Sequence, residues 1–276
     1  MCTLTRVSRA GFYRRGVSTR PAPVELRDRV QRVALEWPTY GSRRITAELR
    51  RGGLSVNRKR VQRLMREDNL LCLRKRKFVA TTDSAHGLRV YPNLAAALLG
   101  SGVNQLWRAD ITYIRLLEEF VFLAVVLDAF SRRVIGWALE ATLEARLAVA
   151  ALEMAFERRR PGPGLVHHSD QGVQYVSHDY VALLESRQVR ISMSRRGNPW
   201  DNATCESFMK TLKCEEVYRS EYRNLAEARV RIGEFLEEIY NQKRLHSSLG
   251  YCPPAEFERL QTSRPMLVAA VAQEAV

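Results

Sequence analysis

Three acidic residues occur in three different local settings, so a fold that brings them together must place a strand, a strand end and a helix side by side. Asp110 lies in a segment whose apolar and polar residues alternate as in a half-buried strand. Asp170 ends a short apolar run, and Glu206 lies one turn into a helix predicted after the breaker Asn198-Pro199. Because buried carboxylates repel one another, their convergence requires a divalent cation that neutralises them.

The ligand chemistry of such a group favours Mg²⁺ or Mn²⁺, because these hard cations prefer carboxylate oxygens. Two such ions about 3.5–4 Å apart can activate an attacking oxygen and stabilise the leaving oxygen of an in-line phosphoryl displacement. Asp110, Asp170 and Glu206 are therefore the candidate catalytic residues and metal ligands, although each alone would more often be a strand-end cap or a solvated acid. Asp128 also lies at a predicted strand end, but the Gly-x-Gln-Tyr pattern after Asp170 is missing there, so we exclude it.

The segments around the three acids resemble the integrase-type DDE transposases, and in detail the OrfB protein of the IS-three family of bacterial insertion sequences. The matching motifs are Trp107-x-Ala109-Asp110-Ile111-Thr112-Tyr113-Ile114, His168-Ser169-Asp170-x-Gly172-x-Gln174-Tyr175 and Asn198-Pro199-x-Asp201-Asn202-Ala203-x-x-Glu206-Ser207-Phe208. The closing segment, Tyr240-Asn241-x-x-Arg244-x-His246-Ser247-x-Leu249-Gly250-Tyr251-x-Pro253-Pro254, resembles that family as well. The resemblance extends from about Gly11 to Phe257.

The resemblance implies an α/β fold: an RNase H-like integrase catalytic core, with a mixed five-stranded sheet flanked by helices, preceded by a small all-α helix-turn-helix domain. The apolar patterns agree with it independently. They predict a three-stranded meander, then a helix, a fourth strand, a second helix and a fifth strand, at 105–114, 119–128, 133–139, 144–159, 165–170, 177–186 and 189–193. The helix that carries Glu206 closes the domain.

On that helix, Lys210 and Lys213 follow Glu206 at i+4 and i+7 and share its face. The resemblance implies that a basic residue seven positions after the catalytic Glu contacts the DNA end, and Lys213 occupies that position. The alternative is an ordinary exposed Glu–Lys helix face. We expect His168 and Asn202 to shape the site, although His168 could also contact substrate.

The net charge of +14 is confined to one segment. Residues 1–80 contain 21 Lys or Arg and 6 Asp or Glu, a balance of +15, whereas the remaining residues contain 23 and 24, a balance of −1. Such concentration is the electrostatic signature of a nucleic-acid-binding arm, since phosphate neutralisation releases counterions. A solubilising charged face is the alternative interpretation.

Within this basic arm (residues 1–82) the apolar spacing predicts three helices. The first runs from Val24 to before Trp37, the second covers 43–50 with Ser42 as its cap, and the third covers 58–67 with Asn57 as its cap. The last two form a helix-turn-helix whose second helix reads DNA. The candidate DNA-binding residues are Arg43, Arg44, Arg58, Lys59, Arg63 and Arg66.

These patterns divide the chain into four parts. They are the basic arm at 1–82 with the helix-turn-helix at about 22–68, a linker at 83–101, the integrase-type core with C-terminal helices at 102–262, and a tail at 263–276. No apolar run reaches the roughly 18–20 residues that span a bilayer. Five cysteines without a CxxC pair indicate a reduced compartment and no disulfide. We expect a cytoplasmic, nucleoid-associated bacterial protein.

The sequence therefore predicts a DDE transposase subunit that uses Mg²⁺, or Mn²⁺, to cleave insertion-sequence ends and join them to target DNA. Its expected partner is double-stranded DNA, on which it forms a homo-oligomer. In the family the active protein is typically a fusion with an upstream OrfA segment, made by frameshifting, so a partner of this kind is expected too. The alternatives are a non-catalytic DNA-binding regulatory protein derived from a transposable element, which the intact triad disfavours, and an RNase H-like nuclease that hydrolyses without joining.

Overall fold

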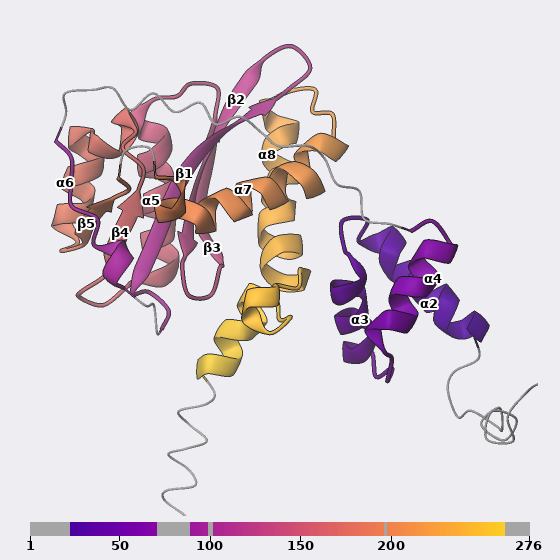
Figure 1. Cartoon of the computed structure of the whole chain (residues 1–276). Helices are drawn as coiled ribbons and strands as arrows, with labels where there is room; N and C mark the ends of the chain where they lie inside the picture. The colour runs from indigo at the N-terminus through magenta and orange to yellow at the C-terminus, as the bar shows by residue number, and fades with distance from the viewer. Residues whose placement is uncertain (1–22, 71–88, 99–101, 196–197, 263–276) are drawn as a thin grey trace, which may run out of the picture. The chain divides into compact units, whose positions relative to one another are not determined.

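The structure, a computed structural model, describes residues 23–70, 89–98, 102–195 and 198–262. These residues form two compact units, one within 1–74 and one within 75–276, which we describe separately. Figure 1 shows the first as a group of helices and the second as a sheet with helices on both sides. The expected tail, 263–276, lies outside the described residues.

The first unit consists of α2 (Pro23–Glu36), α3 (Ser42–Arg51) and α4 (Arg58–Glu67), close to the predicted bounds. Their apolar faces meet in a small core of Leu26, Val30, Tyr40, Ile45, Leu49, Val61, Leu64 and Met65. Asn57 caps α4 as predicted, because its side chain accepts a hydrogen bond of 2.8 Å from the Lys59 N–H. The prediction that Ser42 caps α3 is wrong: the helix begins one residue earlier, so Gly41 is the cap and Ser42 is already helical.

The second unit contains one mixed five-stranded sheet with the strand order β3-β2-β1-β4-β5. The strands are β1 (Leu106–Arg115), β2 (Phe120–Asp128), β3 (Val134–Glu140), β4 (Val166–Ser169) and β5 (Arg190–Met193). The first three form the predicted antiparallel meander, and β4 and β5 add in parallel on the other side of β1. The strand β1 is therefore central.

Two layers of helices cover the sheet (Figure 1). One face packs on α5 (Ala145–Arg159) and α6 (His178–Ser186), and the other on α7 (Ala203–Glu215) and α8 (Leu225–Glu234). The contact between α5 and the sheet is close at Gly136, where an added Cβ would lie 2.1 Å from the Ala151 carbonyl oxygen. Short helical turns lie at Ala95–Ala97, Val173–Val176, Pro199–Asn202, Val217–Arg219 and Ser247–Leu249.

The C-terminal part of the unit fastens the edge strand β3. The helix α8 continues into a π-helix, η5 (Phe235–Lys243), and a last helix covers 254–262. From η5, the Asn241 side chain pairs with both backbone groups of Val134, accepting from its N–H and donating to its carbonyl at 2.9 Å each. Arg244 binds Glu215 of α7 through two hydrogen bonds of 2.8 Å, and both side chains are buried. The closing segment that begins at Tyr240 thus covers the edge of the sheet at β3.

The expected linker, 83–101, is described only at 89–98, and there it packs on the second unit rather than bridging the two units freely. The backbone N–H groups of Leu94 and Ala95 donate to the Ser192 hydroxyl at 2.9 and 3.3 Å. Ala95 is buried against Leu106 and Val166. The described part of the expected linker is therefore part of the packing of the second unit.

Candidate active site

The parallel pairing of β1 with β4 brings the first two predicted acids to the same level of the sheet. Arg108 lies opposite His168 in this register, and Asp110 and Asp170 each follow two residues later. Since side chains alternate along a strand, Asp110 shares a face with Ile114, which packs in the core beneath α7 and α8. Asp110 in β1 therefore lies at about the same level as Asp170, which follows the end of β4.

A tight turn fixes Asp170 just beyond the end of β4. Its Oδ1 accepts a hydrogen bond of 2.9 Å from the Gly172 N–H. A Cβ at residue 172 would lie 3.0 Å from that same oxygen, so a larger residue would press against the carboxylate. The Asp-x-Gly spacing in the sequence therefore encodes the orientation of a carboxylate.

The helix α7 supplies the third acid and a lysine. Glu206 lies in its first turn with an exposed side chain, and Lys210 is exposed as well. Lys213 is buried, with its Nζ 4.5 Å from the centre of the Tyr113 ring on β1. Burial lowers the pKa of Lys213, and the charge of Asp110 acts in the opposite direction. Lys213 thus lies beside the acids, as the helical spacing predicted, but more enclosed than a surface DNA contact.

The charges of Asp170 and Glu206 both act on Asp110. Burial, together with the negative charges of Asp170 and Glu206, raises the pKa of Asp110 to about 8, although the Ile111 N–H and Lys213 oppose the shift. The Ile111 N–H donates to Asp110 Oδ1 at 2.9 Å. The fold therefore holds Asp110 where its negative charge is disfavoured unless a cation is added.

The carboxylate oxygens of the three acids are suitable ligands for a divalent cation, although the three side chains do not form a coordination geometry. Among the residues that the structure describes, no group of three or more His, Cys, Asp or Glu side chains has metal-binding geometry. The three acids nevertheless offer only carboxylate oxygens, which suit Mg²⁺. Their mutual repulsion at Asp110 is the interaction that a bound cation would reverse.

His168 is a structural link between strands and is fully buried. Its Nδ1 lies 2.8 Å from the Ser192 hydroxyl on β5, and its Nε2 lies 3.0 Å from the Ser194 hydroxyl just beyond that strand. Burial lowers its pKa to about 4, with a smaller contribution from the nearby Arg108, so the ring is neutral at pH 7. These contacts favour a role in shaping the site over contact with substrate.

Asn202 and its neighbours connect the start of α7 to β1. The Asn202 amide donates to the Ala109 carbonyl at 3.2 Å, next to Asp110. The Asp201 carboxylate accepts two bonds from the Arg195 guanidinium, at 2.9 and 3.0 Å, and one from the Arg195 N–H at 2.9 Å. These bonds hold the pKa of Asp201 well below its ordinary range. Arg108 donates to the Asp201 carbonyl.

Sequence reasoning missed this clasp, defined as Arg108, Arg195 and Asp201. A signal was present, because Arg195 and Asp201 both lie in the motif before Glu206 and carry opposite charges. What the sequence cannot give is that the loop turns back so that the two charges meet. The clasp fixes the approach of α7 to β1, and with it the position of Glu206 relative to Asp110.

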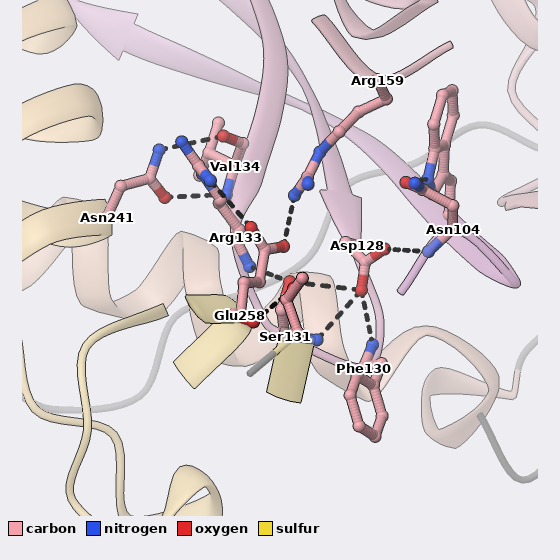
Figure 2. Close-up of polar contacts among 11 residues, drawn as sticks. Asn104, Asp128, Phe130, Ser131, Arg133, Val134, Arg159, Asn241 and Glu258 are labelled. Atoms are coloured by element: carbon pink, nitrogen blue, oxygen red, sulfur yellow. Dashed lines mark hydrogen bonds and ion pairs between the residues drawn. The ribbon is translucent and has the colours of Figure 1, made fainter. Parts of the chain in front are cut away.

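Asp128 lies outside this group, in a buried network at the turn after β2 (Figure 2). Its Oδ2 accepts from the Asn104 N–H at 2.7 Å. Its Oδ1 accepts from the Phe130 N–H at 3.0 Å and from the Ser131 N–H and hydroxyl at 2.9 and 3.2 Å. Because the turn after β2 engages one carboxylate oxygen and Asn104 engages the other, these contacts favour a structural role for Asp128.

In the first unit, most of the predicted DNA-binding side chains are exposed. They are Arg43, Arg58, Lys59, Arg63 and Arg66. Arg44 is half-buried, with its guanidinium carbon 5.4 Å from the centre of the Tyr40 ring. Arg63 also lies 3.7 Å from Glu67 one turn later. The basic run at 74–77 lies outside the described residues.

Comparisons with known proteins agree with this architecture. Residues 23–78 match the HTH-like domain family, and residues 100–199 and 187–254 match integrase core domain families. The transposase InsF of insertion sequence IS3A from Escherichia coli K12 is 39% identical over 269 residues, covering 94% of this chain and 92% of its own. This chain belongs to the insertion-sequence transposase family.

A second relative, a 31 kDa protein of insertion element IS600 from Shigella sonnei, is 40% identical over 266 residues and spans 93% of this chain and 97% of its own. Among solved structures, the HTLV-2 integrase catalytic core aligns with 58% of the chain at 16% identity and a TM-score of 0.45. The family resemblance inferred from the motifs is thus confirmed, as are the integrase-type core and the N-terminal helix-turn-helix-like domain.

The transposase is a DNA-binding polynucleotidyl transferase of a class that depends on divalent metal ions. Within the part of the chain that is described, no helix is long and apolar enough to cross a membrane.

Proposed function

We propose that Asp110, Asp170 and Glu206 are the catalytic carboxylates with which this transposase cleaves the ends of an insertion sequence and joins them to target DNA. The observation that carries the proposal is the interaction at Asp110 of β1, where Asp170, just after the neighbouring strand β4, and Glu206 of α7 both act on one enclosed carboxyl group. Acids whose charges repel one another beside the central strand have no role in packing that would offset this repulsion.

The three acids would hold two Mg²⁺ ions, which when bound activate the attacking oxygen and stabilise the leaving oxygen of the phosphoryl displacement. The chain's own residues orient the reactants. Gly172 fixes the Asp170 carboxylate, and Asn202 holds the start of α7 against Ala109, the neighbour of Asp110. Lys213, enclosed beside Asp110, provides a positive charge for the phosphate of the DNA end.

The test of this function is an assay for joining as well as cleavage. The full chain, with or without an upstream segment, is incubated with Mg²⁺, a labelled duplex carrying the element's terminal sequence and a circular target. We expect 3′-ended cleavage products and label covalently attached to the target, both abolished by a chelator. Cleavage without attachment would support the nuclease alternative instead, and DNA binding without either product would support the regulatory one.

The DNA partners of the two units are proposed to differ. The helix-turn-helix of the basic arm would bind duplex DNA through the exposed cations of α4, and the second unit would bind the reacting ends. Since cleavage and joining involve two element ends, the active form would be a homo-oligomer on DNA, with an upstream OrfA segment contributing recognition or assembly. Such an enzyme would act at the bacterial nucleoid.

Replacing Arg58, Lys59 and Arg63 with Ala should reduce the salt dependence of duplex binding. Because log affinity falls with log salt by about 0.9 per neutralised phosphate, the slope should flatten by up to about three units if all three contact phosphates. Fluorescence anisotropy across a salt series measures it. Replacing Arg229, Arg158 and Arg223 of the second unit, each paired with a glutamate, is the matched control and should leave the slope nearly unchanged. Equal slopes for the two triple variants would contradict the assignment.

A further inference from the structure

Trp200 is the most exposed large hydrophobic side chain among the described residues, at 84%. Tryptophan is usually well buried, and Trp107 is fully buried here while Trp37 and Trp137 are partly buried. A single exposed apolar side chain requires no special explanation. Trp200 does require one because of its position: it lies in the turn that leads into α7, the helix of the candidate catalytic residue Glu206.

The backbone around Trp200 is held in place on both sides. Its own N–H donates to the Asn198 side chain at 3.1 Å. The next residue, Asp201, is fastened through its carboxylate to Arg195 and through its carbonyl to Arg108. The indole is thus presented to solvent from a fixed backbone, which lowers the entropy lost when its face is covered by a ligand.

The same bonds place Trp200 close to the carboxylates. Asn202 bonds the carbonyl of Ala109, the residue before Asp110. Two residues of chain span at most about 7 Å, so the Cα of Trp200 lies within that distance of the Cα of Asn202. Two exposed cationic side chains belong to the same part of the chain: Arg195, which is 66% exposed, and Lys210 of α7, one turn after the exposed Glu206.

We propose that Trp200 stacks on an unpaired base of the DNA end, beside the phosphate that the carboxylates process. This inference rests on the proposed function. In this proposal the end frays where its phosphate reaches the carboxylates, and the adjacent base is unstacked at a cost of a few kcal/mol. An aromatic face accepts any base, so the interaction is independent of sequence and replaces the lost base stacking.

A mutant cycle between the indole and the base tests this proposal. Wild type, Trp200→Ala and Trp200→Phe, each as the full chain, are assayed for end binding and Mg²⁺-dependent cleavage on duplexes with a single abasic site at successive positions around the cleaved phosphate. We expect Trp200→Ala to lower cleavage about 5- to 150-fold, the range of a lost base–aromatic stack, and Trp200→Phe to retain most activity. At one abasic position, wild type and Trp200→Ala should be equally slow, whereas elsewhere the difference should persist.

Phe120→Ala is the matched control, because Phe120 is 53% exposed but pairs with Arg115, five residues along β1 from Asp110. It should couple to no abasic position. An equal Trp200→Ala defect on every substrate would overturn the proposal in favour of a structural role, and a change in oligomeric state measured by light scattering would overturn it in favour of a protein interface. If the wild type binds ends but does not cleave them, the proposed function is wrong. The stacking proposal is judged separately, from the end-binding measurements, and is overturned if the effect of Trp200→Ala on binding is the same at every abasic position.

Discussion

Asp110→Asn should lower DNA cleavage and joining by at least about a thousandfold while making the metal-free protein more stable. Loss of a metal-ligating charge removes several kcal/mol of transition-state stabilisation, and each 1.36 kcal/mol corresponds to a tenfold change in rate. The free energy of unfolding should rise, because the substitution removes a buried negative charge that two other acids repel. Asparagine keeps the shape of the side chain without that charge.

The gain in stability should depend on pH. The pKa of Asp110 rises from 3.8 to about 8 on folding. Between these values the folded protein retains a proton that the unfolded chain has released, so the stability of the wild type falls as the pH rises. The asparagine side chain of the variant has no such proton, and the advantage of Asp110→Asn over wild type should be absent below about pH 4 and largest near pH 8. Thermal unfolding in a chelator at about pH 4.5 and pH 8, followed by circular dichroism, measures the difference.

The other acids give the comparisons. Asp170→Asn and Glu206→Gln should abolish both reactions, and Glu206→Gln should change the melting temperature least, because that side chain is exposed. Asp128→Asn is the matched control. It presents an amide N–H₂ to backbone donors that now bond a carboxylate, so it should lose about 1–3 kcal/mol of stability but retain activity per folded molecule. Near wild-type activity in a triad variant would remove that residue from the site, and an inactive but folded Asp128→Asn would show that the second acid was misplaced.

The contrast between Asp110 and Asp128 shows how far the sequence alone reaches. Alternation predicted the strand of Asp110, and motif spacing selected Asp170 and Glu206 as its candidate partners, because both are local patterns. The sequence also separated Asp128 from the triad by the residues that follow it. Neither pattern shows that Asp110 is enclosed or that Asp128 caps a turn, since those facts depend on which distant segments pack against each strand.

Other features escaped prediction for the same reason. Lys213 was placed on the correct helix face, but its burial against Tyr113 depends on how closely α7 approaches β1. The clasp between Arg195 and Asp201 depends on a loop that returns on itself. The side chain of Asn241 occupies the edge of β3 more than a hundred residues away in sequence. Local propensity carries no information on such long-range contacts.

Glu258→Gln should lower the melting temperature of the second unit by about 5–10 °C. Glu258, on the last helix, binds Arg159 of α5 and, at 2.7 Å, Arg133 of the turn before β3 (Figure 2). Although burial opposes ionisation, the hydrogen bonds from these arginines lower the pKa of Glu258. Removing the charge leaves two guanidinium groups without a counter-charge, which should lower the free energy of unfolding by about 2–3 kcal/mol. The loss is not larger because Arg133 is partly exposed to solvent. In a domain of this size each kcal/mol of lost stability lowers the melting temperature by about 2–4 °C, which gives the expected shift.

The control is the same substitution at an exposed pair. Glu140 lies 3.5 Å from Arg229, and both side chains are more than one-third exposed, so Glu140→Gln should change stability by less than about 1 kcal/mol. Equal melting temperatures for the two variants would show that the Glu258 cluster contributes no more than a surface pair. Because Glu258 connects the last helix to the same turn that Asp128 caps, its loss should also increase amide exchange in 254–262 and in the β2–β3 turn together. An increase confined to the helix would mean that the helix is held to the unit without supporting the turn.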